Sequence, residues 1–141
     1  MAIQPTELAH TERTKLRKLF LFDCACGLVA GIIYSLGFEY IIEAFLLPRW
    51  VVLIQLISNF SYALYGAILY MSGTTRLGFF RLLVAMNVTY ASLCGMCGLA
   101  FMLTLEPSPL GAWLLIVEAA FIAALALVED RFLLRQALAR S

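Results

Sequence analysis

The sequence predicts an all-α protein: a four-helix transmembrane bundle, with short interfacial helices in the first external link and in the C-terminal tail. Two observations about composition support this class. Hydrophobic residues make up 63% of the 141 residues and charged residues only 13%, and the mean hydropathy is +0.93. Four apolar segments are each about 20 residues long, enough to cross a hydrocarbon core of about 30 Å. Lipid is therefore the expected solvent for most of the chain.

The chain opens with a polar segment, residues 1–18, which we expect to be cytoplasmic. The first span follows at 19–38. Basic residues precede it, as they do in a signal peptide, but its apolar run is longer than a signal sequence needs and no A-x-A-like cleavage site closes it. We therefore expect a permanent span.

The first link contains two glutamates four residues apart among apolar side chains, Glu39 and Glu43. This pattern predicts a short helix at the membrane interface over 39–49. Pro48 is expected to stop that helix, because proline lacks the amide hydrogen that a continuing helix requires. The second span is predicted at 51–71.

Glycines and prolines mark the remaining links. They place the third span at 82–103 and the fourth at 111–128. Arginines alternate with leucines in the last segment, 129–141, which predicts an amphipathic cytoplasmic continuation.

The distribution of basic residues predicts the orientation. Of the ten lysines and arginines, four precede the first span, two lie in the second link and three lie in the tail, whereas the first link holds only Arg49. Nine basic residues on one side against one on the other predict that both termini are cytoplasmic.

Several polar residues fall inside the predicted spans, where an ionisable group is costly unless it is paired or neutral. With a rise of 1.5 Å per residue, Asp23 and Asn87 lie roughly 6 Å and 8 Å from the cytoplasmic boundary. Asn59 and Glu118 both lie about 12 Å from the outer boundary. The sequence thus predicts two polar tiers, with Tyr62 and Tyr90 as hydrogen-bond donors at intermediate depth, and Gln55 with Tyr34 as a third tier.

Two interpretations of these tiers remain open. In one, they form a cleft for a proton or a small ligand, with Glu118 as the central group and Asp23 as a cytoplasmic gate. In the other, they are hydrogen-bonding groups that hold the helices together. A neutral glutamine would serve the second purpose as well as Glu118 does, so Glu118 favours the first.

Small residues recur along the first and third spans, which allows helices to approach closely in lipid. They predict contact between these two spans, or an exposed face that forms a homo-oligomer or binds a larger partner. The residues are Gly27, Gly31 and Ser35 in the first span, and Ala91, Gly95 and Gly98 in the third.

No cofactor or metal site is predicted. The four cysteines form two pairs, Cys24 with Cys26 and Cys94 with Cys97, and helical rise separates the pairs by roughly 10 Å in depth. The single histidine, His10, lies outside the spans, and no Ser-His-Asp or Cys-His arrangement is available. An enzyme is not expected, nor is nucleic acid a partner, because there is no polybasic face.

The layout resembles a widespread group of small four-span bacterial inner-membrane proteins of uncharacterised activity, over about Leu16 to Arg135. Tyr90 stands where that group often has tryptophan, and the cysteines are not part of its pattern. The resemblance implies the same fold, the same topology and the bacterial inner membrane. The matching features are Asp23, Leu47-Pro48, Tyr62-Ala63, Arg81-Leu82 with Asn87, Gly111 and Glu118.

Two functions follow as expectations. The first is a non-enzymatic structural or accessory component of a membrane complex, or a homo-oligomer, whose surroundings are the lipid bilayer. The alternative is a small-molecule or proton pathway that uses Glu118 with Asn59 at mid-membrane depth.

Overall fold

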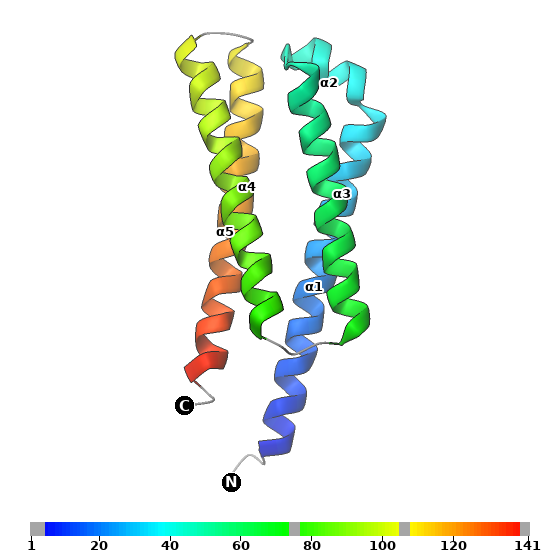
Figure 1. Cartoon of the computed structure of the whole chain (residues 1–141), viewed down its shortest axis with the longest axis vertical. Coiled ribbons are helices and arrows are strands. Elements are labelled where there is room, and N and C mark those ends of the chain that lie inside the picture. Colours follow the sequence, from blue (N-terminus) through cyan, green and yellow to red (C-terminus); the bar gives the residue numbers. More distant parts are fainter. Residues whose placement is uncertain (1–4, 74–76, 105–107, 139–141) are drawn as a thin grey trace. The chain divides into compact units, whose positions relative to one another are not determined.

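The computed structural model of the protein describes residues 5–73, 77–104 and 108–138. Every regular element in these ranges is a helix, which confirms the predicted all-α class (Figure 1). The helices are α1 (Pro5–Leu36), α2 (Phe38–Phe45), α3 (Arg49–Ser72), α4 (Leu77–Thr104) and α5 (Pro109–Leu138).

Four segments of these helices are long and apolar enough to cross a membrane, so the chain is a small integral membrane protein. Each segment runs a few residues beyond the predicted span at one or both ends, because helices continue through the polar residues that flank an apolar core. The fourth is the clearest case, since it extends past Val128 to Phe132. The segments are Thr14–Leu36, Arg49–Ser72, Gly78–Thr104 and Pro109–Phe132.

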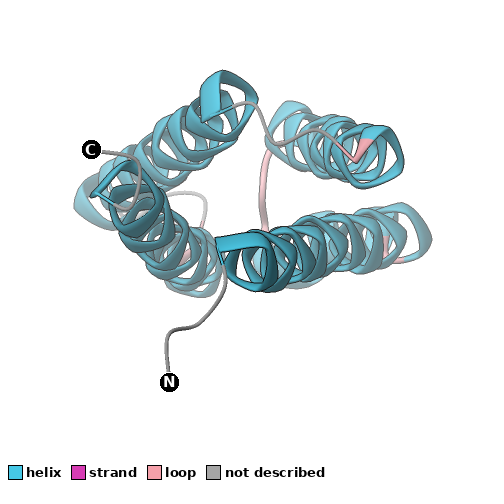
Figure 2. Ribbon diagram, turned by 90° about the horizontal axis from the view of Figure 1, so that it is seen from below, coloured by secondary structure: helices cyan, strands magenta, loops and turns pink. Residues whose placement is uncertain are grey.

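The described residues gather into two compact units. The first lies within Met1–Gly37 and Leu53–Thr75, and the second within Phe38–Val52 and Arg76–Ser141. Helix α1 and most of α3 form a hairpin in the first unit. Helices α4 and α5 form an antiparallel hairpin in the second (Figures 1 and 2). Helix α2 belongs to the same unit and contacts α5.

In the first unit, α1 and α3 approach so closely that backbone meets backbone. A Cβ atom added at Gly27 would lie 2.9 Å from the carbonyl oxygen of Asn59, and one at Gly66 would lie 3.2 Å from the amide nitrogen of Cys24. A Cβ at Gly31 would lie 3.1 Å from the ring of Phe60. Glycine at these positions is therefore what allows the helices to pack at this distance.

In the second unit, the buried face of α5 repeats at alternating steps of three and four residues, the spacing of a helix that packs along one stripe. The face consists of Ala112, Leu115, Ala119, Ile122, Ala126 and Glu129. A Cβ added at Gly98 of α4 would lie 2.8 Å from the Cγ1 atom of Ile116, so the two helices are in tight contact there.

The predicted contact between the first and third spans through their glycines differs from what the structure shows. Gly27 and Gly31 face α3, whereas Gly98 faces α5, so each glycine packs against the helix that completes its own hairpin. Gly95 stands 3.7 Å, measured from an added Cβ, from the methyl group of Ala119. Ser35 is exposed and takes no part in these close contacts.

The predicted short helix of the first link is present as α2, which ends at Phe45 rather than reaching Arg49. It ends there because Leu46 adopts a left-handed backbone conformation, with φ at 52°. The Ser108 hydroxyl, ahead of α5, donates a 2.8 Å hydrogen bond to the carbonyl of Phe45 and accepts one from the amide of Gly111. This serine therefore caps α5 and fastens the end of α2 to it.

Candidate functional site

A buried polar contact in the second unit joins α4 to α5. Asn87 donates from its side-chain amide to an Oε atom of Glu129 at 2.8 Å, and both residues are buried, Glu129 with no exposed surface at all. A polar group in hydrocarbon is tolerated when it is hydrogen-bonded inside the protein. The pair therefore ties the two helices together at the end of the hairpin nearer the C-terminus.

Glu129 was not among the residues that sequence reasoning selected. The predicted fourth span ended at Val128, which assigned Glu129 to the cytoplasmic tail together with its charged neighbours. The signal that identifies it is spacing: Ala126 follows Ile122 by four residues and Glu129 follows Ala126 by three, so Glu129 continues the buried stripe of α5. An acidic residue on the buried stripe, such as Glu129, faces the neighbouring helix, whereas the adjacent Asp130 is exposed.

A second contact joins the same helices nearer the middle of the fourth span. The Tyr90 hydroxyl donates to an Oε atom of Glu118 at 3.2 Å, and both side chains are partly buried. Glu118 follows the start of the span at Pro109 by nine residues, about 14 Å along the helix, which is close to half of a 30 Å core. Two residues predicted as site residues are thus brought together.

In the first unit, the amide of Asn59 turns back onto its own helix and donates to the backbone carbonyl of Gln55 at 2.9 Å. An i to i−4 bond of this kind satisfies one of the two N–H groups of the amide without a second helix. Asn59 and Gln55 are both buried. A position at mid-depth therefore does not by itself make Asn59 part of a cleft, because one N–H of its amide is bonded to its own helix.

Asp23 is fully buried, and Tyr62 is half-buried. Asp23, Gln55 and Tyr62 each engage at least one neighbouring group. The predicted pairings of Asp23 with Asn87 and of Asn59 with Glu118 join residues of different units and stay predictions.

A cation–π contact joins α1 and α3 at one end of the first hairpin. The guanidinium of Arg17 lies over the ring of Tyr70, 4.9 Å from its centroid. A cation over an aromatic face within about 6 Å is attracted by the ring quadrupole. In the second hairpin, near the start of α4, the rings of Phe80 and Phe132 meet edge to face at 6.1 Å.

The chemistry available to these groups is proton exchange and hydrogen bonding. Among the described residues, no three histidine, cysteine, aspartate or glutamate side chains gather as metal ligands would. The four cysteines are thiols rather than disulfides. Glu118 and Glu129 are carboxyl groups of the second hairpin that could carry a proton, and each accepts a hydrogen bond from α4.

No family model, curated protein or solved structure matches the chain. The class of the protein is therefore defined by its helices alone. Four of the described helices are long and apolar enough to span the bilayer, as in an integral membrane protein.

Proposed function

We propose that the protein is a non-enzymatic structural or accessory component of a membrane complex, or a homo-oligomer that acts in that way. One observation carries the proposal: two of the three acidic residues in the α5 span, Glu118 and Glu129, each accept a hydrogen bond from the neighbouring helix. These are the contacts expected of groups that hold a hairpin together.

The exposed surface supports the same function. Large apolar side chains face outward along all four spans, including Val29, Ile57, Met96 and Val117. In a bilayer such a surface meets either lipid tails or other transmembrane helices, and shape complementarity distinguishes the two. Because Glu118 and Glu129 form hydrogen bonds within the second hairpin, the exposed apolar surface is the part of the protein suited to bind other transmembrane helices.

The test is to purify the tagged full chain from its native membrane, in a mild detergent and separately in lipid nanodiscs, and to measure its mass. A homo-oligomer or a stoichiometric membrane partner in both media is the expected result. A lone monomer in both media would contradict the proposal. As a matched control, the exposed Val117→Leu variant conserves the apolar surface and should retain the assembly.

A proton or small-molecule pathway is the second candidate, and the Tyr90 to Glu118 contact is the observation that favours it. A phenol bonded to a half-buried carboxyl can pass a proton along the span. Proteoliposomes that contain Glu118→Gln should lose flux under this hypothesis, because glutamine keeps the side-chain size but cannot exchange a proton. The exposed Glu43→Gln variant is the control, and unchanged flux in Glu118→Gln would rule out the role.

We also propose the bacterial inner membrane as the location, membership of the four-span group described above, and a cytoplasmic position for both termini. The excess of basic residues at one side of the predicted spans supports the orientation. Reporter fusions at each terminus test it, using a reporter that fluoresces only in the cytoplasm. A fluorescent signal from both fusions is expected, and a signal from only one would overturn the even number of spans.

A further inference from the structure

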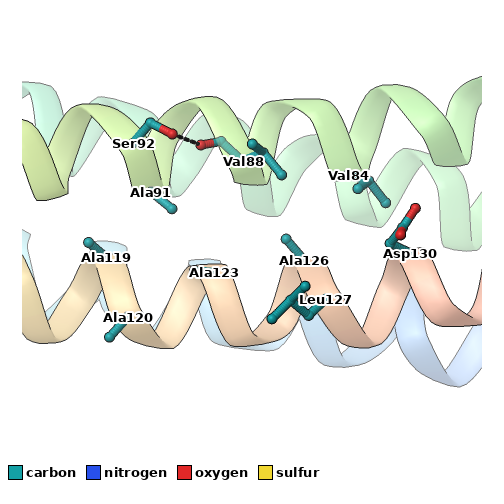
Figure 3. A pocket seen from close by; sticks show the side chains of 10 residues that line it. All are labelled: Val84, Val88, Ala91, Ser92, Ala119, Ala120, Ala123, Ala126, Leu127 and Asp130. Carbon is teal, nitrogen blue, oxygen red and sulfur yellow. Dashed lines mark hydrogen bonds between the residues drawn. The ribbon is translucent and has the colours of Figure 1, made fainter.

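The α4/α5 hairpin carries an open groove of about 610 Å³ along one face. Small side chains from both helices line it, and Figure 3 shows Ala91, Ala119 and Ala126 projecting between the two helices. Val88 and Leu127 also line the groove. Its volume falls within the range of about 300–1,000 Å³ typical of pockets that hold a small ligand.

The length of the groove matches one leaflet of a bilayer. From Ala119 to Asp130 along α5 is eleven residues (130 − 119), about 16 Å of helix. Half of a hydrocarbon core of about 30 Å is about 15 Å. Asp130 lies two residues before the span ends at Phe132, which is the depth of lipid headgroups. A transmembrane helix would run through both leaflets, whereas a lipid chain reaches through only one.

Charges of both signs stand at the headgroup end. Asp130 lines the groove there and is exposed. Arg81, also exposed, precedes Val84 by three residues and Val88 by seven, so it lies on the face of α4 that lines the groove. Arginine matches phosphate oxygens in geometry, and a carboxylate forms strong hydrogen bonds with a protonated amine.

We propose that this groove binds one phospholipid of the leaflet next to the C-terminal end of α5, with a headgroup that carries both a phosphate and a primary amine. The acyl chain lies along the alanines of the groove. The phosphate lies at Arg81 and the ammonium at Asp130. A lipid with a phosphate but no amine would leave Asp130 facing a second negative charge.

The first experiment fills the groove. The full chain is purified in mild detergent with equal amounts of phosphatidylethanolamine, phosphatidylcholine and phosphatidylglycerol, and retained lipid is measured by native mass spectrometry. Ala123→Phe should lower the retained phosphatidylethanolamine roughly tenfold. Ala124→Phe is the matched control, because Ala124 is the next residue, is exposed and does not line the groove. Equal retention by the two variants would overturn the proposal.

The second experiment tests the headgroup and does not depend on how a bulky side chain is accommodated. Asp130→Asn should lower the ratio of bound phosphatidylethanolamine to phosphatidylglycerol roughly tenfold, while Asp130→Glu keeps it. Because Asp130 is exposed, both variants are expected to fold, and circular dichroism verifies this. An unchanged ratio in Asp130→Asn would overturn the assignment of the amine to Asp130.

A competing occupant is a helix from a second copy of the chain. In that case cross-linking would give a dimer that Ala123→Phe abolishes and Ala124→Phe preserves, with no difference in bound lipid, and this result would overturn the lipid proposal. The structural role proposed above does not depend on either outcome, because it rests on contacts within the hairpin and not on the groove.

Discussion

The hairpin of α1 and α3 is packed through Gly27, Gly31 and Gly66, whereas the hairpin of α4 and α5 adds two carboxyl hydrogen bonds to a close contact at Gly98. Lipid offers no hydrophobic force to press helices together, so each hairpin depends on direct packing and on polar contacts. Overpacking a tight contact costs about 1–3 kcal/mol. An interhelical hydrogen bond in a bilayer contributes about 0.6 kcal/mol on average and about 1.7 kcal/mol at most.

The comparison therefore teaches that polar residues inside a span need not be its main source of stability. The first hairpin places one buried amide, that of Asn59, on its own backbone, and its helices come into backbone contact at glycines. The second uses amide and phenol donors to give partners to two acidic side chains. The glycines set the distance between the helices of the first hairpin. The hydrogen bonds of the second hairpin help to fix which residues of α4 and α5 face one another.

The largest effect is expected from Gly27→Ile, which would drive a branched side chain into the backbone of α3 at 2.9 Å. We expect a loss of about 3 kcal/mol or more in the free energy of unfolding, measured by denaturant titration in mixed micelles. Gly78→Ala is the control: a Cβ there meets nothing within 4 Å, and alanine is the better helix former, so stability should hold or rise by up to about 1 kcal/mol. Equal losses from both variants would refute the close-packing account of the first hairpin.

Next in size is Glu129→Leu, which removes the acceptor of a fully buried amide. A buried donor left without its acceptor costs about 1–3 kcal/mol. A double-mutant cycle with Asn87→Leu isolates the contact, and we expect a coupling energy between about 0.6 and 1.7 kcal/mol. Asp130→Asn, at the exposed neighbouring position, should change stability by less than about 0.5 kcal/mol. A coupling energy of zero would mean that the pair does not stabilise the second hairpin.

A smaller change is expected from Tyr90→Phe, which deletes only the hydroxyl that reaches Glu118 at 3.2 Å. The bond is long and partly exposed, so we predict a loss of about 0.5–1 kcal/mol in the same titration. Tyr40→Phe, at an exposed position in α2, should have almost no effect. If the two phenylalanine variants behave alike, the Tyr90 contact adds nothing to the hairpin.

The smallest effect is expected from the ion pair between Arg49 and Glu39, whose nearest atoms are 2.6 Å apart and whose side chains are 69% and 59% exposed. Glu39→Gln should lower stability by no more than about 0.5 kcal/mol, since exposed pairs contribute little and salt screens them. The loss should shrink further as sodium chloride is raised. If Glu39→Gln lowered the free energy of unfolding as much as Glu129→Leu does, the exposed ion pair would contribute as much stability as the buried Asn87–Glu129 hydrogen bond, and the prediction would be wrong.

The number and type of helices could be predicted from the sequence, because four apolar runs in a chain of this length leave few alternatives. The partners of the polar residues could not. Depth from helical rise placed Asn59 level with Glu118, yet depth does not reveal which way a side chain turns, and the amide of Asn59 bonds to its own helix. Glu129 was assigned to the tail because it stands next to Asp130 and Arg131, and only its place on the buried stripe distinguishes it from them.

Helix α5 is one unbroken rod from Pro109 to Leu138. Its 30 residues measure about 45 Å, whereas the hydrocarbon core is about 30 Å thick. Its final turns must therefore either stand clear of the acyl chains or be accommodated by tilting the whole rod. Because the helix is continuous from Pro109 to Leu138, a spectroscopic probe attached near Phe132 would report the tilt of the whole span against the bilayer normal.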